Sequence, residues 1–183
     1  MLTILCLLTV SCSFKASNEF ERIISRVDKY LSERPVLITS EQITKDGKEM
    51  YAYYAYKIIK YELHHTINWT FSSSSPYSAS IKISCDALDN AQSGDLFSDI
   101  SEFQTKLEII AREASGFSTT QMALDHPAFT KESRWTITVE YAYREDGWIY
   151  LGMTGGPPSD YFVSDLERFP QNKRFRDAIG MHI

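Results

Sequence analysis

The sequence of 183 residues has only three cysteines, too few for a scaffold built from disulfides. It also lacks an excess of positive charge, because 19 Lys and Arg residues stand against 24 Asp and Glu residues. Nucleic-acid-binding domains usually carry a basic surface, so we expect no nucleic-acid partner. With 43% hydrophobic and 13% aromatic residues, the chain is not a disordered one. Its length fits a single folded domain.

The motifs of common metal, nucleotide and catalytic sites are missing as well. The sequence has no His-x-x-x-His, no Cys-x-x-Cys and no Gly-x-Gly-x-x-Gly. His64 and His65 are adjacent, so on a regular strand they point to opposite faces and cannot bind one metal ion. The glycines of Gly152–Pro158 are followed by two prolines, which lack the amides that a phosphate loop needs. We therefore expect no metal, no cofactor and no catalytic residue that the sequence alone can name.

The N-terminal residues Met1–Val10 form an uncharged, largely apolar run. Ten residues are about half of the roughly 20 that span a bilayer as a helix, and they match the apolar part of a secretory signal. The run leads into Thr9-Val10-Ser11-Cys12, which resembles the lipobox of bacterial lipoproteins. That resemblance implies removal of residues 1–11, a lipid on Cys12 that anchors the protein in the cell envelope facing the periplasm, and a tether over 12–17. An ordinary cleaved secretory signal and an intracellular protein are the alternatives.

Two helices and a helical C-terminus are expected from the spacing of apolar residues. Asn18–Glu33 and Leu96–Ala114 each place apolar residues three and four apart on one side. Asn18 is the expected N-cap of the first helix. Ser159 is expected to cap a short helix that carries Phe162 and Leu166, and a last helical piece follows at Asn172–Ile179.

Alternating apolar and polar residues predict the strands. Asp46-Gly47 predicts a tight hairpin, and the segment Met50–Phe71 is long enough that we expect a break or bulge near Lys57–Tyr61. The expected strands are Val36–Thr44, Met50–Phe71, Ala79–Asp86, Arg134–Tyr143 and Trp148–Thr154. The fold class is thus α+β over residues 18–183: a mainly antiparallel sheet of five to six strands, with two amphipathic helices on one side and a short helical C-terminus.

The segment Asp146-Gly147-Trp148-Ile149-Tyr150-Leu151-Gly152 resembles the closing hairpin of NTF2-like domains. Such domains open with a helix and curve their sheet over a pocket, which is what the resemblance implies here. A cystatin-like arrangement, with one helix on a meander of strands, and an unassigned helix-on-sheet fold are the alternatives.

Tyrosine and tryptophan are concentrated on the expected strands, and we predict that they form a binding face on the side that the helices leave uncovered. Their rings have an apolar body and a polar tip, which suits protein interfaces. Ordinary cross-strand packing of aromatic residues is the alternative. The candidate residues are Tyr51, Tyr53, Tyr54, Tyr56, Trp69, Trp135, Tyr141 and Trp148.

Three hypotheses on function remain open from the sequence. The first is a non-enzymatic cell-envelope lipoprotein that binds a protein partner or a small ligand, such as an immunity, inhibitor or accessory protein. The second is an envelope hydrolase or transferase that uses Cys85 with a nearby histidine (His64, His65 or His126) in a pocket under a curved sheet. The third is a eukaryotic secreted glycoprotein, because Asn68-Trp69-Thr70 matches the N-glycosylation acceptor.

Overall fold

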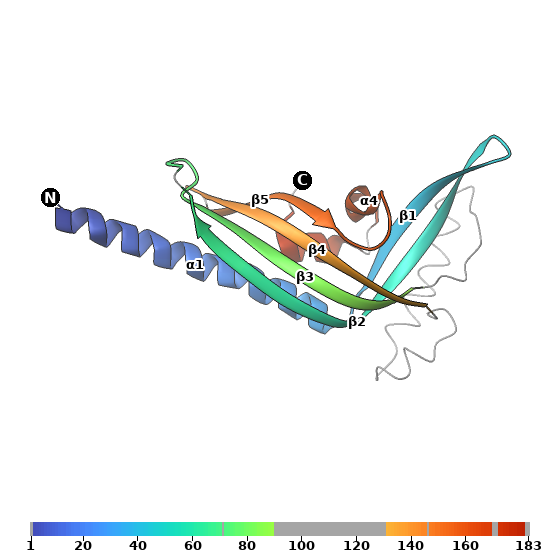
Figure 1. Ribbon diagram of the computed structural model, residues 1–183, viewed down its shortest axis with the longest axis horizontal. Coiled ribbons are helices and arrows are strands. Elements are labelled where there is room, and N and C mark those ends of the chain that lie inside the picture. The colour runs from blue at the N-terminus through green and yellow to red at the C-terminus, as the bar shows by residue number, and fades with distance from the viewer. Residues whose placement is uncertain (1, 71, 90–130, 146, 170–171, 182–183) are drawn as a thin grey trace.

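A computed structural model describes residues 2–70, 72–89, 131–145, 147–169 and 172–181 of the chain (Figure 1). The described strands form one antiparallel five-stranded sheet in which each strand pairs with its neighbours in sequence. They are β1 (Val36–Lys45), β2 (Lys48–Trp69), β3 (Tyr77–Asp89), β4 (Lys131–Arg144) and β5 (Gly147–Gly155). The predicted α+β class with an antiparallel sheet is confirmed.

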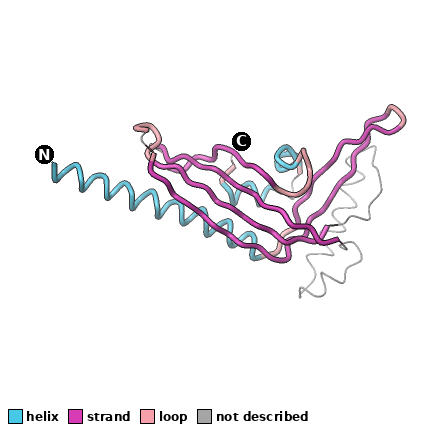
Figure 2. Tube along the Cα trace, in the orientation of Figure 1, coloured by secondary structure: helices cyan, strands magenta, loops and turns pink. Residues whose placement is uncertain are grey.

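The described helices lie on one face of this sheet (Figure 2). They are α1 (Leu2–Ser32), α4 (Phe162–Arg168) and α5 (Lys173–Ile179). Helix α1 runs along the sheet and projects past the end that carries the β2–β3 loop, whereas the β1–β2 hairpin projects from the opposite end (Figure 1). The predicted short helical C-terminus is confirmed, and the predicted helix Leu96–Ala114 lies outside the described residues.

The main hydrophobic core lies between this face of the sheet and the three helices. Alternation along the strands directs every second residue into it, as the sequence predicts. The fully buried members include Phe20 and Val27 of α1, Ile81 and Ile83 of β3, and Phe175 of α5.

Helix α1 begins at Leu2, so the predicted start at Asn18 is wrong. No glycine or proline interrupts the chain between these two positions, and the helix therefore continues through them. Ala16 is buried against Tyr77 and Tyr143, which holds this stretch on the sheet. Residues 14–17, expected in the tether, are thus part of a helix that packs on the domain.

Two local predictions for β1 and β2 are confirmed. Lys45 pairs with Lys48, and the two residues between them, Asp46 (φ 52°) and Gly47 (φ 73°), have the positive φ angles of a two-residue hairpin turn. Strand β2 is continuous, with a shift in its pairing to β3 between Ile58 and Lys60. This bulge falls inside the predicted range and places the apolar residues on both sides of it against the same core.

Ser159 is not the cap of α4, contrary to the sequence prediction. The helix begins after Tyr161, and no side chain caps it. The Ser159 hydroxyl instead donates a hydrogen bond to the carbonyl oxygen of Ser40, at 2.8 Å, and accepts one from the amide of Tyr161, at 3.1 Å. The serine therefore connects the C-terminal segment to strand β1.

Candidate functional site

The face of β2, β3 and β4 that points away from the helices is polar, and we call it the outer face. Its members alternate with the core residues of the same strands, and none of the helices that the structure describes lies on it. Three cations and three anions balance each other there, and the other members are mainly serine and threonine. The outer face consists of Lys60, Glu62, His64, Thr66 and Asn68 on β2, Ser78, Ser80, Lys82, Ser84 and Asp86 on β3, and Arg134, Thr136, Thr138 and Glu140 on β4.

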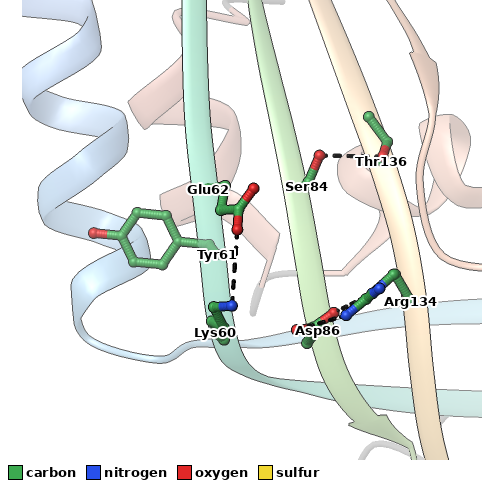
Figure 3. A pocket seen from close by; sticks show the side chains of 7 residues that line it. All are labelled: Lys60, Tyr61, Glu62, Ser84, Asp86, Arg134 and Thr136. Atoms are coloured by element: carbon green, nitrogen blue, oxygen red, sulfur yellow. Dashed lines mark hydrogen bonds and ion pairs between the residues drawn. The ribbon is translucent and has the colours of Figure 1, made fainter.

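A hollow of about 250 Å³ lies on the outer face next to the β2 bulge (Figure 3). The strand register brings its side chains together in two cross-strand rows. Lys60 pairs with Asp86, which pairs with Arg134; Glu62 pairs with Ser84, which pairs with Thr136. Tyr61 also lines the hollow, but its side chain points toward α1, where its hydroxyl donates to Asp28 Oδ1 at 2.8 Å.

Paired charges dominate the hollow. The Arg134 guanidinium donates two hydrogen bonds to Asp86, from Nε to Oδ1 at 2.5 Å and from Nη2 to Oδ2 at 3.2 Å. This hydrogen bonding lowers the pKa of Asp86 below its usual range, so the carboxylate is ionised at neutral pH. Lys60 Nζ lies 3.7 Å from Glu62 Oε1.

Hydroxyl groups complete the lining of the hollow. Ser84 and Thr136 are 3.4 Å apart between their oxygens, a long hydrogen bond that leaves further donor and acceptor positions for a ligand. The hollow therefore offers a ligand charged groups of both signs and hydroxyl groups that can form further hydrogen bonds. This chemistry suits the binding of polar groups, and no cysteine or histidine nucleophile lies among its lining residues.

The described members of the predicted aromatic face do not form one exposed surface. Tyr56, Trp135 and Tyr141 are buried in the core under the helices. They belong to the strand face that the helices cover, because large aromatic rings supply much of the apolar area that a core needs. These three positions are thus unavailable to a partner in this structure.

The remaining aromatic candidates are scattered. Tyr54 is half-buried and its hydroxyl donates to Glu41 Oε2 at 3.1 Å, while Trp148 is half-buried at the other end of the sheet. Trp69 has 59% of its surface exposed. The side chains of Tyr51 and Tyr53 lie outside the described part of the structure.

Cys85 is only 1% exposed, and burial raises the pKa of its thiol to about 12. His65 is four residues along β2 from Tyr61, the residue paired with Cys85, which corresponds to about 13 Å along the strand. His64 lies on the outer face, and His126 lies outside the described residues. The described residues thus do not bring a histidine beside this thiol.

Sequence reasoning missed the residues that line the hollow. A signal was present, because the polar members of the alternating strands define the outer face directly. The prediction of a binding face was based on the Tyr and Trp residues of the strands instead, although these residue types are equally suited to a hydrophobic core. Tyr56, Trp135 and Tyr141, chosen for an uncovered face, lie on the face that the helices cover.

No protein-family model, curated protein or solved structure matches this chain. None of the helices in the described residues is long and apolar enough to cross a membrane. Across the same residues, no three His, Cys, Asp or Glu side chains are grouped as metal ligands would be.

Proposed function

We propose that this chain is a non-enzymatic cell-envelope lipoprotein, anchored by a lipid on Cys12, whose domain binds a protein or another polar ligand through the outer face. The observation that carries the binding half is the hollow at Lys60, Asp86 and Arg134, which is open to solvent on a face without a described helix. The lipobox-like sequence at Thr9-Val10-Ser11-Cys12 supports the anchor.

The chemistry of the hollow favours an extended polar ligand such as a peptide segment of a partner protein. Exposed ion pairs contribute little to folding stability, so a ligand can replace one member of a pair at small cost. A ligand carboxylate can take the place of Asp86 on Arg134, and a ligand amide can bond to Ser84 or Thr136. An immunity, inhibitor or accessory protein acts through this kind of contact.

The envelope-enzyme hypothesis has less support, since its candidate nucleophile Cys85 is buried and has a raised pKa. A reactive cysteine needs the opposite surroundings, an exposed thiol with a lowered pKa. The secreted-glycoprotein hypothesis concerns the outer face itself, because Asn68 is exposed on it. A glycan there would cover part of the surface that we propose as the binding site.

The anchor is tested by growing cells that express the full chain with an alkyne analogue of palmitate. Cys12→Ser should abolish the label, whereas the matched variant Cys6→Ser, altered within the predicted signal, should keep it. Equal labelling of the Cys12→Ser protein would rule out the anchor.

The binding face is tested by photocrosslinking in the same cells. A photoreactive amino acid at Thr136, in the hollow, should give a discrete adduct, and one at Lys29, exposed on α1, should not. Arg134→Ala should weaken the Thr136 adduct without unfolding the domain, because Arg134 is exposed. Equal adducts from both positions would contradict a specific outer-face site.

A further inference from the structure

Four aromatic residues cross the end of the sheet in a single row. Trp69 of β2 pairs directly with Tyr77 of β3, which pairs with Tyr143 of β4, which pairs with Trp148 of β5. Consecutive ring centroids are 5.4, 6.0 and 5.2 Å apart, and each pair meets edge to face. We call this the aromatic row. Tyr77 and Tyr143 are buried, and Trp69 is exposed at the end of the row.

Helix α1 is fixed to the aromatic row at Ala16. This residue packs against Tyr77 and Tyr143, and its carbonyl oxygen accepts a hydrogen bond from Trp148 Nε1 at 2.7 Å. Cys12 is four residues earlier in the same helix, which corresponds to about 6 Å of helix length. A lipid on Cys12 would therefore be attached within about one helical turn of this end of the sheet.

We propose that this end of the domain docks on the bilayer surface, with Trp69 and Phe14 in the membrane–water interface. The inference rests on the proposed lipid anchor. Phe14 is 70% and Trp69 59% exposed. Trp69 is the last residue of β2, before the β2–β3 loop, and Phe14 is two residues before Ala16 on α1. The β2–β3 loop lies at the end past which α1 projects (Figure 1). Tryptophan favours the interfacial zone of a bilayer. Exposed apolar side chains next to a lipid anchor can add their own contacts with the bilayer and so hold this end of the domain against it.

The contact with the bilayer is apolar rather than electrostatic. Lys15 and Glu19 form an ion pair of 3.8 Å on α1, and Arg144 and Glu145 stand side by side at the β4–β5 turn. Asp146 follows Glu145 in the sequence, so these acidic residues outnumber the basic ones by one. The docking end therefore has no excess of positive charge that would attract anionic lipids. Docking should therefore be nearly independent of lipid charge and of salt.

This orientation explains how the outer face stays accessible in a lipid-anchored protein. The strands run from the docking end toward the β1–β2 hairpin, which projects from the opposite end (Figure 1). With Trp69 and Phe14 in the interface, the outer face does not lie against the bilayer, and the hollow stays open to solvent. Cys12 and Ala16 lie in the same helix, and Ala16 packs on the sheet, so the lipid would be held close to this end of the domain.

The test uses the lipidated mature protein, residues 12–183, in phosphatidylcholine vesicles, with a polarity-sensitive fluorophore on an introduced cysteine. Ser72→Cys, exposed in the β2–β3 loop next to an intact Trp69, reports on the docking end, and Lys48→Cys, exposed at the β1–β2 hairpin, is the matched control. Buried Cys85 should not react with the dye, and the lipid occupies the sulfur of Cys12. We expect a several-fold rise in emission with a blue shift at position 72 and no change at position 48.

Unlabelled protein provides a second measurement that needs no cysteine. Vesicles with brominated acyl chains should quench part of the tryptophan emission of the wild type, and Trp69→Phe should lose that quenching. Vesicles containing phosphatidylserine should give the same signals. Quenching that requires the anionic lipid would contradict the apolar contact.

Failure of the docking and failure of the anchor give different results. If Cys12 carries lipid but position 72 reports the same aqueous surroundings as position 48, the docking is overturned and the anchor stands. If Cys12 carries no lipid, both are overturned.

Discussion

The side-chain amide of Asn172 pairs with both main-chain groups of Ile38, as a neighbouring strand would. Its Oδ1 accepts from the Ile38 amide at 3.0 Å, and its Nδ2 donates to the Ile38 carbonyl oxygen at 2.8 Å. Two residues further along β1, the main-chain N–H of Ser40 donates a hydrogen bond to the carboxylate of Asp165. The main-chain carbonyl oxygen of Ser40 accepts one from the hydroxyl of Ser159. Three side chains of the C-terminal segment thus close part of the edge of β1, which would otherwise be open to pairing with another chain.

Replacing Asn172 with alanine should lower the free energy of unfolding by about 2–3 kcal/mol, because it leaves a buried amide and carbonyl of Ile38 without partners. Urea denaturation of the full chain measures the change. Asn68→Ala, at an exposed position, is the control and should differ little from the wild type. If Asn172→Ala lowers the free energy of unfolding no more than Asn68→Ala does, the main-chain groups of Ile38 do not depend on Asn172 for their hydrogen bonds.

Asp165 should make stability depend on pH in the direction opposite to an ordinary surface carboxylate. Burial raises the pKa of this carboxyl group in the folded state, and the bonds from Ser40 offset the rise only in part. The unfolded chain then ionises first, near pH 3.9, so stability falls as pH rises from there through the folded-state pKa.

The comparison variant is Asp165→Asn, which has no proton to lose. The free energy of unfolding of the wild type relative to this variant should fall as the pH is raised above about 4, as followed by urea titrations at several pH values. If the free energy of unfolding of the wild type instead rises with pH relative to that of Asp165→Asn, the pKa of Asp165 is not raised in the folded state.

Gly155 should tolerate no side chain. Its φ is +76°, and a Cβ there would overlap with the carbonyl oxygen of Thr136. Gly155→Ala should therefore destabilise the domain by about 2–4 kcal/mol. Gly152→Ala on the same strand meets no atom within 4 Å and has no positive φ, so it should stay within about 0.5 kcal/mol of the wild type. Thermal unfolding of the two variants side by side decides this, and equal melting temperatures would refute the packing at Gly155.

Cys85 should be inert toward a thiol reagent in the folded protein at pH 8, because its thiol is buried and its pKa is about 12. The wild type and Cys85→Ala should show the same number of fast-reacting thiols when folded. In denaturant the wild type should show one more. A fast extra thiol in the folded wild type would revive the enzyme hypothesis.

The strands were predictable because their signals are local. Alternation fixed which residues share a face, and Asp46-Gly47 marked the hairpin from two residues alone. Alternation does not tell which face the helices cover, however, and rings such as Tyr141 and Trp135 suit a core as well as an interface. The edge closure was not predictable, since Asn172 and Ile38 are 134 residues apart and neither carries a local signal of the other.

A lipid on Cys12 underlies both the proposed function and the proposed docking on the bilayer. It is tested most directly by the intact mass of the mature protein purified from the membrane fraction of expressing cells. We expect a chain that has lost residues 1–11 and carries lipid on an N-terminal Cys12. An unmodified N-terminus at another residue, or the mass of the whole chain without lipid, would contradict it.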